Sequence, residues 1–195
     1  MKIVLASGNR GKLREFREAF GEEILALDEV TEPFEIVEDA ETFAGNALLK
    51  ARALYEKLGP GWLVISDDSG ISVPLLGGAP GIYSARYAGA GASDRENLQK
   101  LIDALKARGV RHAPAYYTAA IAVVGERGEQ VVHGWMHGEV IDEVRGDKGF
   151  GYDPIFIPEG YHRTLGQLEE SVKVKISHRA KAIERVRPLI DLMAR

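Results

Sequence analysis

The chain has 195 residues, of which 45% are hydrophobic and 28% charged, with a formal net charge of −4 and no cysteine. These values are ordinary for a globular protein, and the lack of cysteine excludes a disulfide framework or a thiolate zinc site. The negative charge argues against binding to duplex nucleic acid, although a local basic cluster can still bind an anionic small molecule.

Targeting and membrane segments are not expected either. No apolar stretch approaches the roughly 20 residues of a membrane span, and the run from Met1 to Ala6 is too short for a signal peptide. We therefore expect a cytoplasmic protein that contacts neither a membrane nor nucleic acid. Its length predicts a single domain over residues 1–195.

Strands and helices are expected to alternate in the first half of the chain. In chain order, this half is predicted as strand 2–6, helix 10–20, strand 24–27, irregular segment 28–41, helix 42–58 and strand 62–65. The second half is predicted as loop 74–92, helix 94–107, hairpin strands 115–124 and 130–141, loop 146–160 and helix 177–194. This order predicts an α/β fold with a mixed sheet flanked by helices.

The segment Ser7-Gly8-Asn9-Arg10-Gly11-Lys12 lies between the first predicted strand and helix. Its glycines let the backbone approach a ligand closely, and the helix start offers free N–H groups to a phosphate. It is not a Walker A loop, which needs Gly at position 6 and Ser or Thr at position 13. The segment predicts either a phosphate-binding loop or a plain strand–helix turn with a solvated lysine.

Two acidic segments are candidates for metal binding or for proton transfer. Asp67 and Asp68 follow a buried strand, and neighbouring side chains of extended backbone point to opposite faces, so one carboxylate is expected to enter a given cleft. It would bind Mg²⁺ or accept a proton from water, unless the segment is simply an Asx-type turn. The stretch 35–41, with Glu38 in its middle, is most simply a solvated loop that matters only if the fold brings it beside Asp68.

Two further segments carry aromatic and basic residues. In Gly149-Phe150-Gly151-Tyr152-Asp153-Pro154, the aromatics would stack on a base or belong to the core of a tight turn. In the segment 173–179, Ser177 is a good N-cap, so His178 and Arg179 fall in a first helical turn, where the helix dipole disfavours cations. A bound anion would explain them, and a solvated basic surface is the alternative.

With these motifs in this order, the chain resembles the inosine/xanthosine triphosphate pyrophosphatases, which remove non-standard purine nucleotides from the nucleotide pool. The resemblance spans nearly the whole chain and rests on SGNRGK at 7–12, Glu38 with TFAGNALLKA at 42–51, SDDSGISV at 66–73, GGAPGIYSARYAG at 77–89, GFGYDPIF at 149–156 and KVKISHRAKA at 173–182. It implies an elongated α/β fold with two lobes and a cleft between them, a homodimer, and Mg²⁺ as the cofactor.

The resemblance also implies roles for individual residues. Glu38 and Asp68 would be the metal ligands, and Asp68 would also be the catalytic general base. The substrate-binding residues would be Ser7, Gly8, Asn9, Arg10, Gly11, Lys12, Lys50, Ser69, Phe150, Gly151, Tyr152, Asp153, Lys173, His178 and Arg179. Within this set, residues 7–12 and Lys50 would hold the triphosphate, and residues 150–153 would hold the base.

Three positions depart from the family pattern: Gly45 where Glu is frequent, Lys148 where a small residue is common, and a loose match over 164–168. None of them removes a proposed catalytic group. Without Glu at position 45, the reciprocal capping bond to Thr42 is missing, which should weaken the start of that helix.

The resulting hypothesis is hydrolysis of ITP, dITP or XTP to a monophosphate and pyrophosphate, with Asp68 activating the attacking water. Donors from the His178–Arg179 end or from loop N–H groups would pair with the purine O6, so the amine of adenine would be rejected. Three alternatives remain from the sequence: a pyrophosphatase of modified pyrimidine or standard nucleotides, a nucleotide-binding regulator without catalysis, and an RNA-binding module.

Overall fold

The structure, a computed structural model, describes residues 1–21, 23–32, 34 and 36–194. Its helices are α1 (Arg10–Phe20), α2 (Leu27–Val30), α3 (Phe43–Leu58), α4 (Asp94–Ala107), α5 (Glu170–Ile176) and α6 (His178–Met193). Its strands are β1 (Lys2–Leu5), β2 (Ile24–Ala26), β3 (Trp62–Ser72), β4 (His112–Gly125), β5 (Gly128–Ile141) and β6 (Phe156–Pro158). Among these described residues, no helix is both long and apolar enough to cross a membrane.

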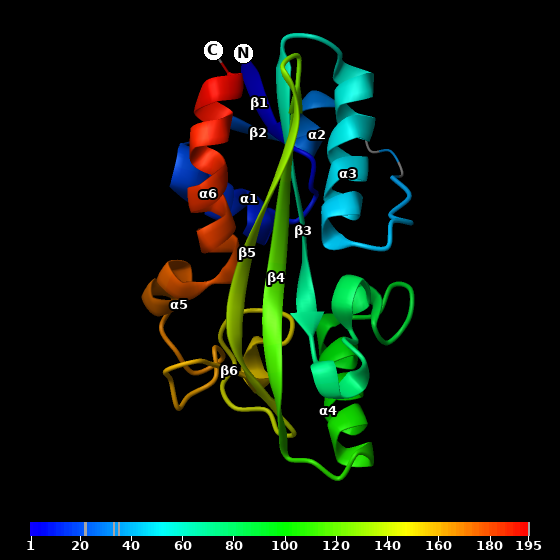
Figure 1. Cartoon of the computed structure of the whole chain (residues 1–195), viewed down its shortest axis with the longest axis vertical. Helices are drawn as coiled ribbons and strands as arrows, with labels where there is room; N and C mark the ends of the chain where they lie inside the picture. Colours follow the sequence, from blue (N-terminus) through cyan, green and yellow to red (C-terminus); the bar gives the residue numbers. More distant parts are fainter. Residues whose placement is uncertain (22, 33, 35, 195) are drawn as a thin grey trace. The chain divides into compact units, whose positions relative to one another are not determined.

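The strands form one mixed sheet in the order β2-β1-β3-β4-β5-β6 (Figure 1). β1 runs parallel to β2 and β3, whereas β5 and β6 are antiparallel, with Val140 opposite Phe156. The chain divides into two compact units, which we describe separately. Unit 1 comprises residues 1–68, 119–134 and 179–195, and unit 2 comprises residues 69–118 and 135–178.

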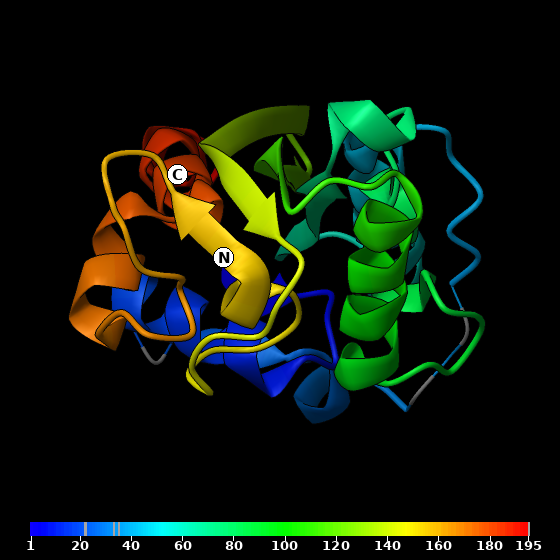
Figure 2. The same cartoon turned by 90° about the horizontal axis from the view of Figure 1, so that it is seen from below.

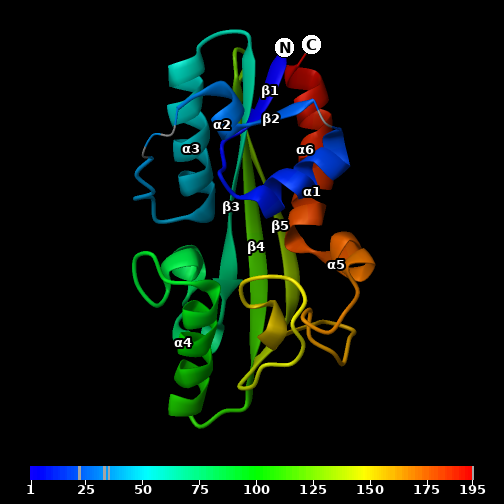
Figure 3. The ribbon, with the colours of Figure 1, turned by 180° about the vertical axis from the view of Figure 1, so that it is seen from behind.

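In unit 1, successive residues of the central strands face two different hydrophobic cores, as the two-residue period of a strand requires. Leu63 and Ile65 pack with α1 and α6, whereas Val64 between them packs with α3. Alanines at 119, 120 and 122 continue the pattern in β4. Figures 1 and 3 show α3 on one side of these strands and α1 and α6 on the other.

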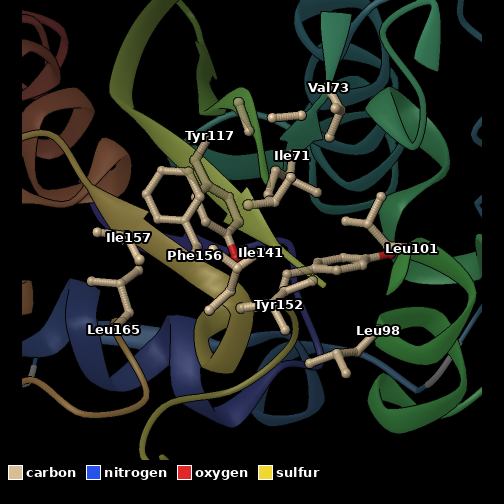
Figure 4. Close-up of a cluster of buried hydrophobic side chains, with 14 of the residues drawn as sticks. Ile71, Val73, Leu98, Leu101, Tyr117, Ile141, Tyr152, Phe156, Ile157 and Leu165 are labelled. Carbon is tan, nitrogen blue, oxygen red and sulfur yellow. The ribbon is translucent and has the colours of Figure 1, made fainter. Parts of the chain in front are cut away.

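Unit 2 has its own core, in which α4 packs on β3, β4 and β5. Leu98, Leu101 and Leu105 of α4 are buried with Ile71, Tyr117 and further apolar side chains (Figure 4). Figure 2 shows β6 beside β5, with α4 to one side of them. The Gly- and Pro-rich loop 74–92 contains two short 3₁₀ helices, Pro74–Leu76 and Gly81–Arg86.

Most predicted elements are confirmed, but the short helix α5 was not expected, and three further expectations are wrong. Segment 28–41 was expected to be irregular, but α2 begins at Leu27, where the Glu29 carboxylate accepts the Ala26 amide at 2.5 Å. β6 was missed because it has only three residues. β3 continues through Asp67 and Asp68 to Ser72, which rules out the Asx-turn interpretation. Glu35, in the predicted acidic stretch, lies outside the described residues.

The start of α4 carries a reciprocal cap that can be tested. The Ser93 hydroxyl accepts the Glu96 amide at 3.3 Å, and the Glu96 carboxylate accepts the Ser93 amide at 2.7 Å. We expect Ser93→Ala to lower the free energy of unfolding by about 0.5–2 kcal/mol, measured by urea titration. Ser171→Ala, at an exposed position inside α5, is the control. An equal loss in both variants would contradict the capping argument.

Candidate functional site

The segment 7–12 forms the turn from β1 into α1. The Ser7 hydroxyl accepts the Asn9 amide at 3.1 Å, and Asn9 Oδ1 accepts the Lys12 amide at 3.1 Å, which caps α1. Gly8 and Asn9 are exposed, as the predicted phosphate contacts require. Arg10 points elsewhere, since its guanidinium donates to the exposed Asp28 carboxylate at 2.8 Å.

The amino groups of Lys12 and Lys50 converge on Asp67 in unit 1. Both donate to its backbone carbonyl oxygen, at 3.2 and 3.0 Å, although 38 residues separate them in the sequence. Burial lowers the pKa of Lys12, and repulsion from Arg179 and Lys50 adds to this effect against the attraction of Asp67. Both ammonium groups are also paired with carboxylates, Lys12 with Asp67 and Lys50 with Glu38 and Asp68. They can therefore offer charged hydrogen-bond donors to an anionic ligand, although the group as a whole carries carboxylates as well.

The two predicted metal ligands, Glu38 and Asp68, are brought together by Lys50. Lys50 Nζ lies 3.2 Å from Glu38 Oε2 and 3.2 Å from Asp68 Oδ1. Burial alone would lower the pKa of Lys50, but the Asp68, Glu38 and Asp67 carboxylates outweigh it and raise that pKa. The stretch around Glu38 is therefore not a simple solvated loop.

One carboxylate oxygen of Asp68 is available to bind a ligand. Its Oδ2 is buried and has no hydrogen-bond partner among the described residues, and burial raises its pKa against the opposing charges of Lys50 and Lys12. The described part of the chain has no cluster of three or more metal-binding side chains. Two carboxylates suffice for Mg²⁺, which usually binds one or two of them together with substrate phosphates, so Glu38 and Asp68 fit this ion.

Asp67 is the centre of a buried ion-pair network that the sequence did not reveal. Its carboxylate lies 2.5 Å from Lys12 Nζ and 3.0 Å from Arg179 Nε, and Arg179 Nη1 lies 2.9 Å from Glu15. Burial alone would raise the pKa of Asp67, but Arg179 and Lys12 outweigh it and hold that pKa far below its ordinary value. Acidic partners thus account for Arg179 at the start of α6, and the argument that a cation there requires a bound anion is wrong for this residue.

Asp153 organises the predicted base-binding loop of unit 2. Its Oδ2 accepts from Lys173 Nζ at 2.6 Å and from the Phe150 amide at 3.1 Å. Gly149 leaves the space for this carboxylate, because a Cβ there would lie 2.1 Å from Asp153 Oδ2. Burial raises the pKa of Asp153, with the Lys173 charge opposing it. Asp153 is thus engaged within the protein.

The two aromatics of this loop differ in exposure. Phe150 is 44% exposed, with Lys173 Nζ 4.4 Å from its ring centroid. Tyr152 is 5% exposed, and its hydroxyl donates to the Ser84 carbonyl oxygen at 2.7 Å. Gly151 donates its amide to Asp94 at 3.0 Å. Phe150 is therefore available for stacking on a base, whereas Tyr152 belongs to the core of unit 2.

His178, also in unit 2, is joined to this loop through Tyr117. The two rings are stacked with centroids 4.7 Å apart and an interplanar angle of 14°. The Tyr117 hydroxyl donates to Asp153 Oδ1 at 3.4 Å. Sequence reasoning missed Tyr117 because it reads as an ordinary apolar strand position. It also missed Glu15, because its partner Arg179 lies 164 positions away in the sequence.

The predicted site residues therefore form two connected groups. Unit 1 brings together Lys12, Glu38, Lys50, Asp68 and Arg179, joined through Asp67. Unit 2 brings together Phe150, Asp153, Lys173 and His178, joined through Tyr117. Ser69, half-buried in β3, follows Asp68 directly in the chain. Arg10 pairs instead with Asp28, which does not belong to the first group.

The departure at Gly45 has a physical reason. A Cβ at this position would lie 2.7 Å from the Cβ of Ala40, so the two residues have room for one methyl group between them. The helix start keeps half of its cap, because the Thr42 hydroxyl accepts the Gly45 amide at 3.0 Å. Lys148, the second departure, pairs with Glu169 on the surface at 2.5 Å.

Comparisons with known proteins agree on one family. The sequence model of the Ham1 family matches residues 3–189. A dITP/XTP pyrophosphatase of a Sulfurovum species is 62% identical, with 99% of this chain and 95% of the relative covered. The protein of the same name from Nautilia profundicola is 60% identical over 94% of each chain. A solved Ham1 protein of Staphylococcus aureus superposes with a TM-score of 0.88 at 38% identity, covering 98% of both chains.

Proposed function

Because the chain belongs to the Ham1 family, we propose that it hydrolyses ITP, dITP and XTP to the monophosphate and pyrophosphate. The names of the Sulfurovum and Nautilia relatives support this substrate class. The observation that carries the proposal is the pair of partly buried ammonium groups of Lys12 and Lys50, which share the Asp67 carbonyl oxygen next to Asp68. This arrangement places two ammonium donors beside a carboxylate whose Oδ2 has no hydrogen-bond partner among the described residues.

The triphosphate is assigned to the residues of unit 1. Exposed Gly8 and Asn9 and half-buried Ser7 and Gly11 form the turn into α1 and its first residues, and amide groups at a helix start bind phosphate oxygens. Lys12 and Lys50 add charge that offsets the phosphate charge as the bond to the leaving group breaks. Ser69 is assigned to the substrate as the neighbour of Asp68, and Arg10 contributes charge at the rim.

Asp68 is assigned the role of general base. The water oxygen bonds to the α-phosphorus, the bond from that phosphorus to the bridging oxygen breaks, and pyrophosphate leaves. The proton released by the water passes to Asp68, whose Oδ2 has no hydrogen-bond partner among the described residues. Mg²⁺ held by Glu38 and Asp68 would neutralise phosphate charge.

The base is assigned to unit 2. Phe150 offers an exposed ring for stacking, and the backbone of Gly151 lies beside it. Tyr152, Asp153 and Lys173 hold this loop in shape. His178 is proposed to donate to the purine O6, with Arg179 supporting the start of α6. An adenine amine would place donor against donor, which costs far more than a missing contact.

The experiment is pyrophosphate release from ITP, dITP, XTP, ATP and GTP, each with Mg²⁺ and with EDTA. We expect Mg²⁺-dependent release from the first three, with kcat/KM for ATP lower by about 10²-fold or more. Equal turnover of ATP and GTP would favour a standard-nucleotide pyrophosphatase. Binding without release would favour a regulator without catalysis. A homodimer in the cytoplasm, which the family resemblance supports, belongs to the same proposal.

A further inference from the structure

Tyr117 lies at the centre of the unit 2 residues assigned to the base. Its ring stacks on His178 at 4.7 Å. It meets Phe156 edge-on, at 4.8 Å and 65°, and Figure 4 shows these two rings next to each other. Only 7% of Tyr117 is exposed, so the ring is held from two sides. An offset or edge-on aromatic pair at these distances is attractive beyond its buried area. Tyr117 therefore fixes the plane of the His178 imidazole.

The same residue links His178 to the loop that carries Phe150. Asp153 Oδ1 accepts from the Tyr117 hydroxyl at 3.4 Å, while Asp153 Oδ2 accepts from Lys173 and from the Phe150 amide. The 3.4 Å bond is long and contributes little by itself. The ring stack is thus the stronger of the two connections.

We propose that Tyr117 is a positioning residue that sets the preference for 6-oxo purines by holding the His178 ring in the plane needed to donate to O6. This inference rests on the proposed function, because it presumes that His178 meets the base. A hydrogen-bond donor discriminates between O6 and an amine only when it is held in place, since a mobile ring can turn away from a mismatched group. In this proposal Tyr117 acts through His178 and is assigned no contact with the base or the reacting phosphate.

The test compares Tyr117→Leu with Tyr117→Phe, using ITP and ATP as substrates and inorganic tripolyphosphate as a competitive inhibitor. We expect Tyr117→Leu to raise KM for ITP by about 3–10-fold and to lower the ITP-to-ATP preference by a similar factor. The value of kcat and the inhibition constant of tripolyphosphate should change by less than about twofold. Tyr117→Phe keeps the stacked ring and should retain the wild-type preference within about twofold.

Tyr116→Leu is the matched control. Tyr116 is the adjacent residue of β4, half-buried, with its ring 5.8 Å from His137 at a tilted angle of 39°. Its replacement should leave the preference unchanged. If Tyr117→Leu does not fold, Tyr117→Met carries the same test, because methionine fills more of the space without supplying a ring.

A double-mutant cycle distinguishes positioning of the His178 ring from a general loss of order around Tyr117. In a His178→Ala background, Tyr117→Leu should have no further effect on the ITP-to-ATP preference, because the group that it positions is gone. Additive effects would overturn the proposal, as would an unchanged preference in Tyr117→Leu. A wild-type protein that releases no pyrophosphate from ITP would instead refute the proposed function.

Discussion

Replacing Asp68 with asparagine is expected to lower kcat for ITP by about 10²–10⁴-fold, the usual contribution of a general base. Asparagine has nearly the same shape, but it cannot take a proton from water and is a poorer ligand for Mg²⁺. The variant should also bind Mn²⁺, used as a probe for Mg²⁺, more weakly in a calorimetric titration. That second measurement does not depend on turnover.

The same variant should fold normally. The raised pKa of Asp68, caused by burial, means that the folded protein disfavours its charged form, so a neutral side chain there should not lower Tm. Asp39→Asn is the matched control, since it removes the same charge from an exposed residue next to Glu38 and should keep wild-type kcat. Near-wild-type turnover of Asp68→Asn would contradict the assignment of Asp68 as the general base.

The second large effect concerns stability. Asp67→Ala should lower the free energy of unfolding by about 3–5 kcal/mol at pH 7, because it leaves the buried charges of Arg179 and Lys12 without their shared carboxylate. Asp28→Ala removes the partner of exposed Arg10 and should cost at most about 1 kcal/mol. Urea titration of both variants, with equal m-values, is the measurement.

The pH dependence of this effect has a definite sign. The folded-state pKa of Asp67 lies below its ordinary value of 3.8, so its stabilisation is fully present above that value and is lost as the pH falls below it. The stability gap between wild type and Asp67→Ala should therefore narrow between pH 5 and the lowest pH at which both proteins fold. A gap that stays constant on acidification would show that Asp67 acts through packing rather than charge.

The sequence predicted best those features that depend on neighbours along the chain. The bounds of α1 and α4 follow from their caps at Asn9 and Ser93 and from apolar residues at helical spacing. β6 and α2 could not be predicted, since three or four residues carry no recognisable period. β3 was expected to end early because two aspartates and a glycine look like a turn, whereas buried cations satisfy Asp67 inside the strand.

The site was predictable as a set of residues but not as a set of contacts. Resemblance named Glu38, Lys50 and Asp68, but only the fold shows that Lys50 lies within reach of both carboxylates. The ion pair of Asp67 and Arg179 joins residues 112 positions apart, and no local sequence pattern predicts it. Tyr152 was assigned to the base from its motif, yet its hydroxyl is bonded to Ser84 within the core.

Residues 40 and 45 have room for only one Cβ between them, and this limit constrains which substitutions the segment accepts during evolution. A larger residue at position 45 is acceptable only after position 40 has lost its Cβ, because the two atoms would otherwise lie 2.7 Å apart. The reverse order passes through a crowded intermediate that selection for stability would remove. Substitutions at these two positions are therefore epistatic, and one order of substitution is favoured. Descendants of this sequence should acquire glycine at position 40 before they acquire a side chain at position 45.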